Sequence, residues 1–126
     1  MSRTLFSFEE ARALIPRVRE ITRTAQARIE ELSAEFSRLG KGSARSQKLH
    51  EWINTVVQDW AGQIEATGAL AKGVWTVDFD SGEGFFFCWS FDEEELSHFH
   101  SYEEGFPGRK PLTGAHKVPR PPAFLN

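Results

Sequence analysis

Cysteine is almost absent from this sequence, which has one, Cys88, among 126 residues. A single cysteine cannot form a disulfide within the chain and cannot supply a thiolate-rich zinc site alone, which fits a reducing compartment. Long apolar runs are missing too. The longest, Phe85 to Trp89, is far short of the roughly 20 residues that span a bilayer, and the first residues lack the apolar core of a signal peptide. We therefore expect a cytoplasmic protein with no membrane segment.

The chain length and composition are those of one folded domain. The sequence is 40% apolar and 26% charged, which is too apolar for wholesale disorder. We predict a single domain over residues 1–112. Residues 113–126 are rich in proline and form a flexible or extended tail in this prediction.

Charge is distributed unevenly along the chain. Residues 1–48 carry a net charge of +4, residues 49–106 carry −11 and residues 107–126 carry +4. Acidic and basic regions of one small domain can attract each other within or between chains, and they weaken the case for a nucleic-acid-binding surface. On the predicted first helix, Arg12, Arg19 and Arg23 form a basic stripe, but acidic residues border it. We do not expect nucleic acid as a partner.

The first half of the sequence predicts a long helical hairpin. Ser7 and Glu10 have the spacing of a capping box, which starts a helix over about residues 8–39. Pro16 predicts a kink in this helix. The glycines around Lys41 favour a short connection to a second helix over about residues 45–67. Its apolar residues spread over a wide arc, so it must bury two faces, against the first helix and against either the sheet or a second subunit.

The length of this hairpin favours self-association. A helix of about 32 residues reaches roughly 48 Å, whereas a compact chain of this size has a radius of gyration near 14 Å. The hairpin should therefore project, and an apolar seam on a projecting arm is most simply covered by another copy. We predict a homodimer that forms through the helix faces.

The second half of the sequence predicts a small antiparallel sheet. Ten of the sixteen aromatic residues lie between Trp75 and Phe106, and aromatic enrichment bounded by Gly, Asp and Ser is typical of strands. We predict three strands, with the middle one central, at residues 74–79, 85–91 and 96–101. The predicted fold is α+β.

Several short motifs resemble those of a known family. The sequence is similar over residues 5–112 to the bacterial domain of unknown function 2203 family, in which an acidic residue usually follows the histidine where this chain has Ser101 and an aromatic often stands in place of His98. This resemblance implies a fold but no activity. It is carried by Phe8-Glu9-Glu10-Ala11, Leu14-Ile15-Pro16, Val77-Asp78-Phe79, Cys88-Trp89, His100, Gly105-Phe106, Gly108-Arg109 and Pro111-Leu112.

Two histidines on the last predicted strand form a candidate metal or structural site. His98 and His100 are two apart, so they share a face of the strand. They could bind a metal with Asp78, Glu103 or Glu104. The alternative, which we favour, is that His98 is a surface residue and His100 a structural histidine bonded to a carboxylate or a backbone carbonyl. No metal or cofactor is predicted, and Cys88 is read as a small core residue.

Arg109 is the strongest candidate for binding an anion. Its loop contains Gly105 and Gly108, and a guanidinium there can make a two-pronged contact with a carboxylate or phosphate. The alternative is an internal clasp that ties the loop to Asp78 or to the turn at residues 92–95.

Together, His100, Glu103 and Arg109 would suffice for acid/base work on an anionic substrate, but no catalytic motif accompanies them. We therefore predict a self-associating accessory or interaction module rather than an enzyme. The alternative is an anion-binding protein or small enzyme that uses these residues, with a metal-dependent version through His98 and His100.

Overall fold

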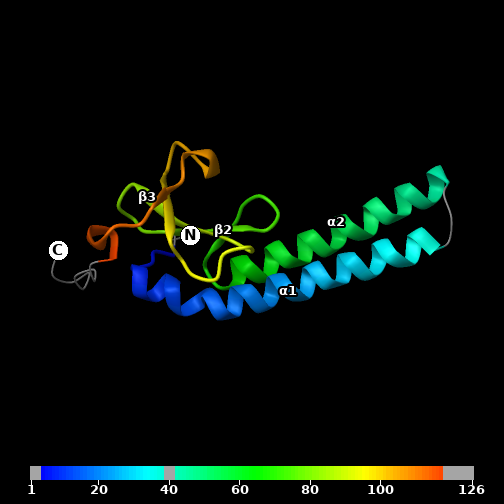
Figure 1. Ribbon diagram of the computed structural model, residues 1–126, viewed down its shortest axis with the longest axis horizontal. Coiled ribbons are helices and arrows are strands. Elements are labelled where there is room, and N and C mark those ends of the chain that lie inside the picture. Colours follow the sequence, from blue (N-terminus) through cyan, green and yellow to red (C-terminus); the bar gives the residue numbers. More distant parts are fainter. Residues whose placement is uncertain (1–3, 39–41, 118–126) are drawn as a thin grey trace.

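Two long helices and a five-stranded sheet make up the computed structural model, which describes residues 4–38 and 42–117. The helices lie side by side, and their far ends project well beyond the sheet (Figure 1). The elements in chain order are α1 (Phe8–Arg38), α2 (Ser43–Ala66), β1 (Leu70–Ala71), β2 (Thr76–Asp80), β3 (Phe85–Ser90), β4 (His98–Ser101), the 3₁₀ turn η1 (Phe106–Gly108), β5 (Lys110–Pro111) and the 3₁₀ turn η2 (Gly114–Lys117).

The predicted capping box starts α1. The amide of Glu10 donates to Ser7 Oγ over 3.1 Å, and the amide of Ser7 donates to Glu10 Oε1 over 2.8 Å, so two free amides of the first turn are satisfied. The helix continues through Pro16 as one element. Its buried residues include Ala11, Val18 and Leu32, which lie on the predicted apolar seam.

The second helix begins two residues earlier than predicted and ends at Ala66. Gly68 follows with a φ of 99°, a conformation that favours glycine, and its amide donates to the carbonyl of Glu65 over 3.0 Å. The helix therefore stops where the sequence placed its C-terminal glycine. Of the predicted connection, Gly40 and Lys41 lie outside the described residues.

The prediction of a three-stranded sheet was wrong, because the sheet has five strands in the order β1-β2-β3-β4-β5. All neighbouring strands are antiparallel, and β3 is central as predicted. The two strands that were missed, β1 and β5, have two residues each. Such short edges carry no alternation that a sequence pattern can reveal, since they form only by pairing with a strand already in place. Other strand ends differ by one or two residues.

One face of the sheet packs on the hairpin and forms the core. Val77 and Phe79 of β2 and Phe87 and Trp89 of β3 are at most 2% exposed. Their neighbours on the helices include Phe8, whose ring centroid lies 6.0 Å from that of Phe87. Since side chains alternate across a strand, the residues between these apolar ones point to the opposite face, which the hairpin leaves uncovered.

The first residues of the predicted tail are ordered. In η2, the ring of His116 lies 4.0 Å from the ring of Phe99 and 5.1 Å from that of Phe85. Residues 118–126, the rest of the predicted tail, lie outside the described residues. Within the part of the chain that the structure describes, neither long helix has the unbroken apolar stretch needed to cross a bilayer.

Candidate functional site

The face of the sheet that points away from the hairpin contains a cleft of about 630 Å³. Its floor includes Thr76, Asp78, Ser90 and His100, which come from three adjacent strands. Its rim is largely apolar and is formed by the segment before β2, by β3 and by the segment after β4. The rim residues are Lys72, Gly73, Val74, Phe86, Tyr102, Gly105 and Phe106.

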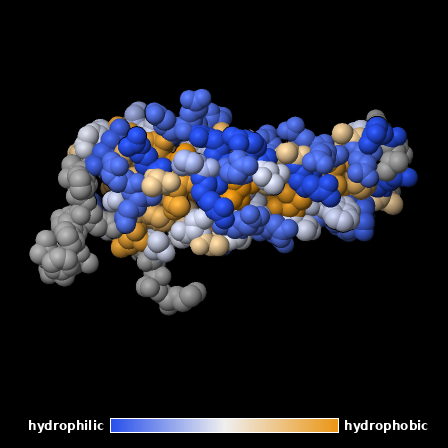
Figure 2. Space-filling view, turned by 90° about the horizontal axis from the view of Figure 1, so that it is seen from below, coloured by the Kyte–Doolittle hydropathy of each residue, from blue (hydrophilic) through white to orange (hydrophobic). Residues whose placement is uncertain are grey.

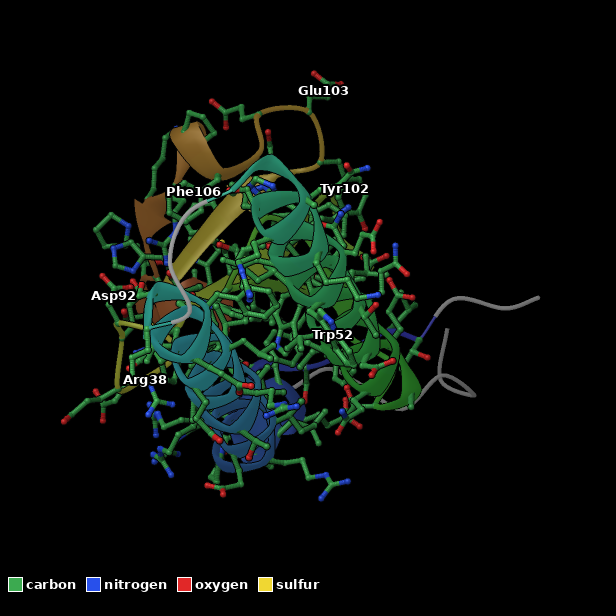
Figure 3. The ribbon with its side chains drawn as sticks, turned by 90° about the vertical axis from the view of Figure 1, so that its right-hand side faces the viewer. Arg38, Trp52, Asp92, Tyr102, Glu103 and Phe106 are labelled. Atoms are coloured by element: carbon green, nitrogen blue, oxygen red, sulfur yellow. The ribbon has the colours of Figure 1, made fainter. Side chains whose placement is uncertain are left out.

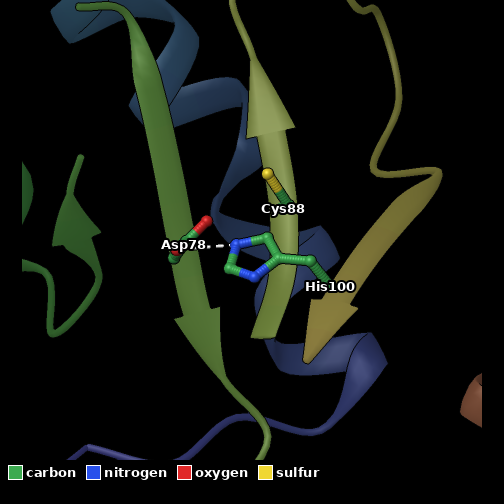
Figure 4. Close-up of side chains that lie close together, drawn as sticks. All are labelled: Asp78, Cys88 and His100. Atoms are coloured by element: carbon green, nitrogen blue, oxygen red, sulfur yellow. Dashed lines mark hydrogen bonds and ion pairs between the residues drawn. The ribbon is translucent and has the colours of Figure 1, made fainter. Parts of the chain in front are cut away.

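Asp78 and His100 form a buried pair at this floor (Figure 4). Asp78 Oδ2 lies 3.0 Å from His100 Nε2, and the two residues are 1% and 4% exposed. They meet because Asp78 lies opposite Cys88 while His100 lies opposite Phe86, on the two sides of the central strand. A buried carboxylate and imidazole are stable only with partners.

The hydrogen bonds of His100 fix which of its nitrogens carries a proton. His100 Nδ1 lies 2.8 Å from the carbonyl oxygen of Ser101. That oxygen can only accept, so Nδ1 must donate. The contact between Nε2 and Asp78 Oδ2 then requires something positive between two electron-rich atoms. It can be a hydrogen on either atom or a cation bound by both.

Cys88 completes a cluster with this pair. One ligand-type atom from each of Asp78, Cys88 and His100 lies within 4.8 Å of the others. Burial raises the pKa of the Cys88 thiol to about 12, and the negative charge of Asp78 adds to this, whereas Arg109 opposes it. In the absence of a metal, Cys88 is therefore a neutral thiol.

The other oxygen of the Asp78 carboxylate, Oδ1, does not take part in the contact with His100. Asp78 Oδ1 is buried, and no hydrogen-bond partner for it is found among the described residues. A buried acceptor without a donor costs about 1–3 kcal/mol. Such an atom calls for a donor, which a ligand group, an ion or a water can supply, and the Cys88 thiol is a weak donor to the same carboxylate.

Arg109 also contacts Cys88 and forms its hydrogen bonds within the chain. Its Nη2 donates to Glu93 Oε1 over 2.6 Å and to the carbonyl of Cys88 over 3.2 Å. Its guanidinium carbon also lies 4.7 Å from the ring centroid of Phe106. Burial opposes the charge of Arg109, but its hydrogen bond to Glu93 and the nearby negative charges outweigh this, so its pKa is raised above the ordinary value.

Glu93 connects several segments around the site. Its carboxylate also accepts the amide of Ser90 over 2.8 Å, and it lies 3.1 Å from His98 Nδ1. Its backbone carbonyl accepts the indole of Trp89 and the guanidinium of Arg19. The turn between β3 and β4 is thereby tied to α1, to its own strands and to the Arg109 loop.

Of the remaining predicted site residues, Gly105 lines the cleft, whereas His98, Glu103 and Gly108 do not. His98 shares a face with His100, as predicted, but its Nδ1 contacts Glu93 and Ser97 and it is not part of the Asp78 cluster. Glu103 is exposed and points away from the molecule at the tip of its loop (Figure 3). Gly105 lines the cleft with a φ of 69°. At Gly108, an added Cβ would lie 2.5 Å from Glu104 Cβ, so only glycine fits.

Sequence reasoning missed the roles of Cys88 and Glu93. Cys88 lies in the continuous apolar run of β3, where no alternation tells which side chains face the core. The sequence did contain one usable signal. Cys88 is two residues from the polar Ser90, so the two side chains lie on the same face of the strand. Glu93 was one of four successive acidic residues, and the sequence did not distinguish it from its neighbours.

The arginines of the predicted basic stripe have partners within the chain. Arg12 pairs with Glu9 and Arg23 with Glu20. Arg19 donates to the backbone carbonyls of Glu93 and Glu94. All three arginines therefore have acceptors within the chain itself.

Comparison with known proteins gives the family of this chain but no activity. No curated protein and no solved structure gives a significant match to this chain. A family model does match it over residues 4–112, a range that includes the whole hairpin, all five strands and the cleft. The chain therefore belongs to the family of uncharacterised conserved proteins described as domain of unknown function 2203 (DUF2203).

Proposed function

We propose that this protein binds a small molecule in the cleft on the open face of its sheet, with Asp78 and His100 as its polar floor. The observation that supports this most directly is the buried Asp78–His100 pair with one carboxylate oxygen left unpartnered. Natural ligand sites combine an apolar wall with a few convergent polar groups in a volume of roughly 300–1,000 Å³. The cleft, at about 630 Å³, falls within that range.

The rim indicates the chemistry of the ligand. Phe106 is 47% exposed and Tyr102 is 39% exposed, and both line the cleft beside Phe86. Aromatic side chains that remain this accessible offer stacking surfaces to a flat ligand. Since the free oxygen of Asp78 can only accept, the ligand should be an aromatic ring that carries an N–H or O–H donor.

Nuclear magnetic resonance tests this proposal. The ¹⁵N-labelled full chain is titrated with small phenols, anilines and aminopyridines. We expect a subset to shift the amide resonances of Thr76, Ser90 and Tyr102 in a saturable way. Replacing Phe106 with Ala should weaken this binding by about tenfold, the equivalent of about 1.4 kcal/mol of lost stacking.

The matched control is Trp52→Ala, which removes another exposed aromatic, 43% exposed, from the far part of α2. It should leave the affinity of the fragments unchanged. If no fragment shifts the cleft residues, or if those that bind shift only the hairpin, the proposal is wrong.

An anion at Arg109 remains a competing proposal within the same region. It requires a ligand that displaces Glu93 from a 2.6 Å contact. Lys72, whose Nζ lies 5.7 Å from the ring centroid of Phe86, is the cation that lines the cleft itself. An anionic group on the ligand would therefore meet Lys72 first.

Self-association is a second candidate function, and the exposure of Trp52 favours it. Leu49 and Val56, one turn away on either side of it, are only partly buried. Apolar patches also remain visible along the hairpin on the face shown in Figure 2. We propose a second copy of this chain as the cover. Sedimentation velocity over a hundredfold concentration range should then show a dimer, and Trp52→Glu should shift it to monomer; a monomer throughout would exclude this role.

A further inference from the structure

We propose that Asp78, Cys88 and His100 bind a divalent transition-metal ion such as Zn²⁺ or Fe²⁺ on the open face of the sheet, at the floor of the cleft. This inference rests on the proposed function, because the cleft supplies the route for the ion and its remaining ligand. It differs from the site suggested by the sequence, which used His98 and His100. In the structure, His98 Nδ1 instead contacts Glu93 and Ser97. The third member of the cluster with Asp78 and His100 is Cys88.

The arrangement of the three atoms suits a metal. Asp78 Oδ2 and His100 Nε2 are 3.0 Å apart, close to the separation of about 3.3 Å between nitrogen and oxygen ligands of a tetrahedral ion. All three ligand atoms lie within 4.8 Å of one another. The sulfur would need to approach by at most about 1.2 Å, since a tetrahedral ion holds sulfur and nitrogen about 3.6 Å apart.

The hydrogen bonds around the cluster favour the same interpretation. His100 donates Nδ1–H to the carbonyl of Ser101 over 2.8 Å, which leaves Nε2, the nitrogen that faces Asp78, as the one able to bind a metal. Metal-bound histidines almost always fix their other nitrogen in this way. A bound ion would also satisfy the requirement for positive charge between Nε2 and Oδ2, and it would offer a positive charge close to Asp78 Oδ1, which has no hydrogen-bond partner among the described residues.

The types of the ligands narrow the choice of metal. One thiolate, one imidazole and one carboxylate suit Zn²⁺, Fe²⁺ or Co²⁺ rather than Mg²⁺ or Ca²⁺, which prefer oxygen alone. On binding, the Cys88 thiol releases its proton to solvent as the bond from sulfur to metal forms. Three protein ligands leave at least one position free, and the cleft beside Asp78 and His100 lets water or the small molecule reach it.

Cobalt substitution gives a direct test, because Cys88 is the only cysteine in the chain. The full chain is stripped with EDTA, dialysed and titrated with CoCl₂ under anaerobic conditions. We expect saturation at one equivalent, with a thiolate-to-cobalt charge-transfer band in the near ultraviolet and intense visible bands from low coordination. One equivalent of ZnCl₂ should remove both sets of bands.

The variants locate the site. Cys88→Ala should lose the charge-transfer band and bind Co²⁺ more than about 100-fold more weakly, since even residues behind the ligands cost 10–100-fold. Asp78→Asn should also weaken binding. His98→Gln, two residues from His100 on the same strand, and His50→Gln, on the exposed surface of α2, are the controls and should retain both the band and the affinity.

Each outcome decides the question. If the wild-type chain gives no thiolate band, or if Cys88→Ala binds Co²⁺ as tightly as wild type, the inference is wrong. If circular dichroism shows that the variants do not fold, the wild-type titration alone still tests whether Cys88 binds the metal, because any thiolate band must come from Cys88. When the band is missing but aromatic fragments still shift the cleft residues, the metal inference fails and the proposed function stands; when both are missing, both fail.

Discussion

The pair formed by Arg109 and Glu93 distinguishes an internal clasp from an anion-binding arginine. Both side chains are mostly buried, at 15% and 16% exposed. Two opposite charges about 4 Å apart attract by about 4 kcal/mol at an effective dielectric constant of about 20. Because both side chains keep some contact with solvent, screening reduces this attraction, and we expect about 2 kcal/mol of coupling between them.

A double-mutant cycle measures this coupling. We expect Arg109→Ala to lower the free energy of unfolding by about 3 kcal/mol, because it also loses the bond to the Cys88 carbonyl and the contact with Phe106. Glu93→Ala should cost about the same, since it leaves the Ser90 amide without its acceptor and the guanidinium with the Cys88 carbonyl but no carboxylate. The double variant should be less destabilised than the sum by about 2 kcal/mol.

Urea denaturation followed by tryptophan fluorescence provides the assay, since guanidinium salts would screen the pair. Lys110→Ala and Glu94→Ala are matched controls, because both side chains are exposed and their loss should change stability by less than about 0.5 kcal/mol. The reasoning is refuted if Arg109→Ala behaves like these controls. Stabilisation of wild type, but not of Arg109→Ala, by inorganic phosphate would then identify Arg109 as an anion site.

Three further predictions concern the core and the site. The pKa of Cys88 is raised from 9.0 to about 12, so the stability that its neutral thiol contributes is complete below pH 9 and is lost as the pH rises toward 12. In EDTA, the free energy of unfolding of wild type should fall by about 1.4 kcal/mol more than that of Cys88→Ala between pH 8 and pH 10. An equal pH dependence of stability in the two proteins would contradict this. Thr22→Val removes the acceptor of the buried Trp60 indole, a bond of 2.9 Å, and should cost about 1–3 kcal/mol in urea denaturation, whereas Thr24→Val on the exposed side should cost little. Gly108→Ala would place its Cβ 2.5 Å from Glu104 Cβ and should lower the free energy of unfolding by about 1–3 kcal/mol. The control is Gly114→Ala, whose Cβ would have nothing within 4 Å and which should be near neutral. If Gly108→Ala is equally neutral, the loop can adjust to the added methyl group and this prediction is wrong.

The helices and the central strands could be predicted because their signals are local. The capping box of Ser7 and Glu10 and the apolar seam of α1 each depend on residues a few positions apart. The strands β1 and β5 could not be predicted, since two residues contain no period and their pairing is decided by what lies beside them. The face of the sheet to which Asp78 and His100 point could be inferred from the alternation of side chains along their strands.

The cluster of Asp78, Cys88 and His100 could not be predicted from the sequence. It depends on the register that places Asp78 opposite Cys88 and His98 on the other side of the same residue. A shift of one residue in either pairing would have turned these side chains to the opposite face. The sequence left two partners open for Arg109, and the choice of Glu93 depends on how the turn after β3 folds back along its own strand.

The consecutive order of the strands has a consequence for how the protein can change. Asp78 and His100 are 22 positions apart, and every pairing in the sheet closes a short stretch of chain. Such local contacts form quickly and at low entropic cost. The outer turns of α1 and α2 take no part in these closures. A change in the length of the hairpin by whole turns would therefore leave the geometry of the cleft and its buried residues unchanged.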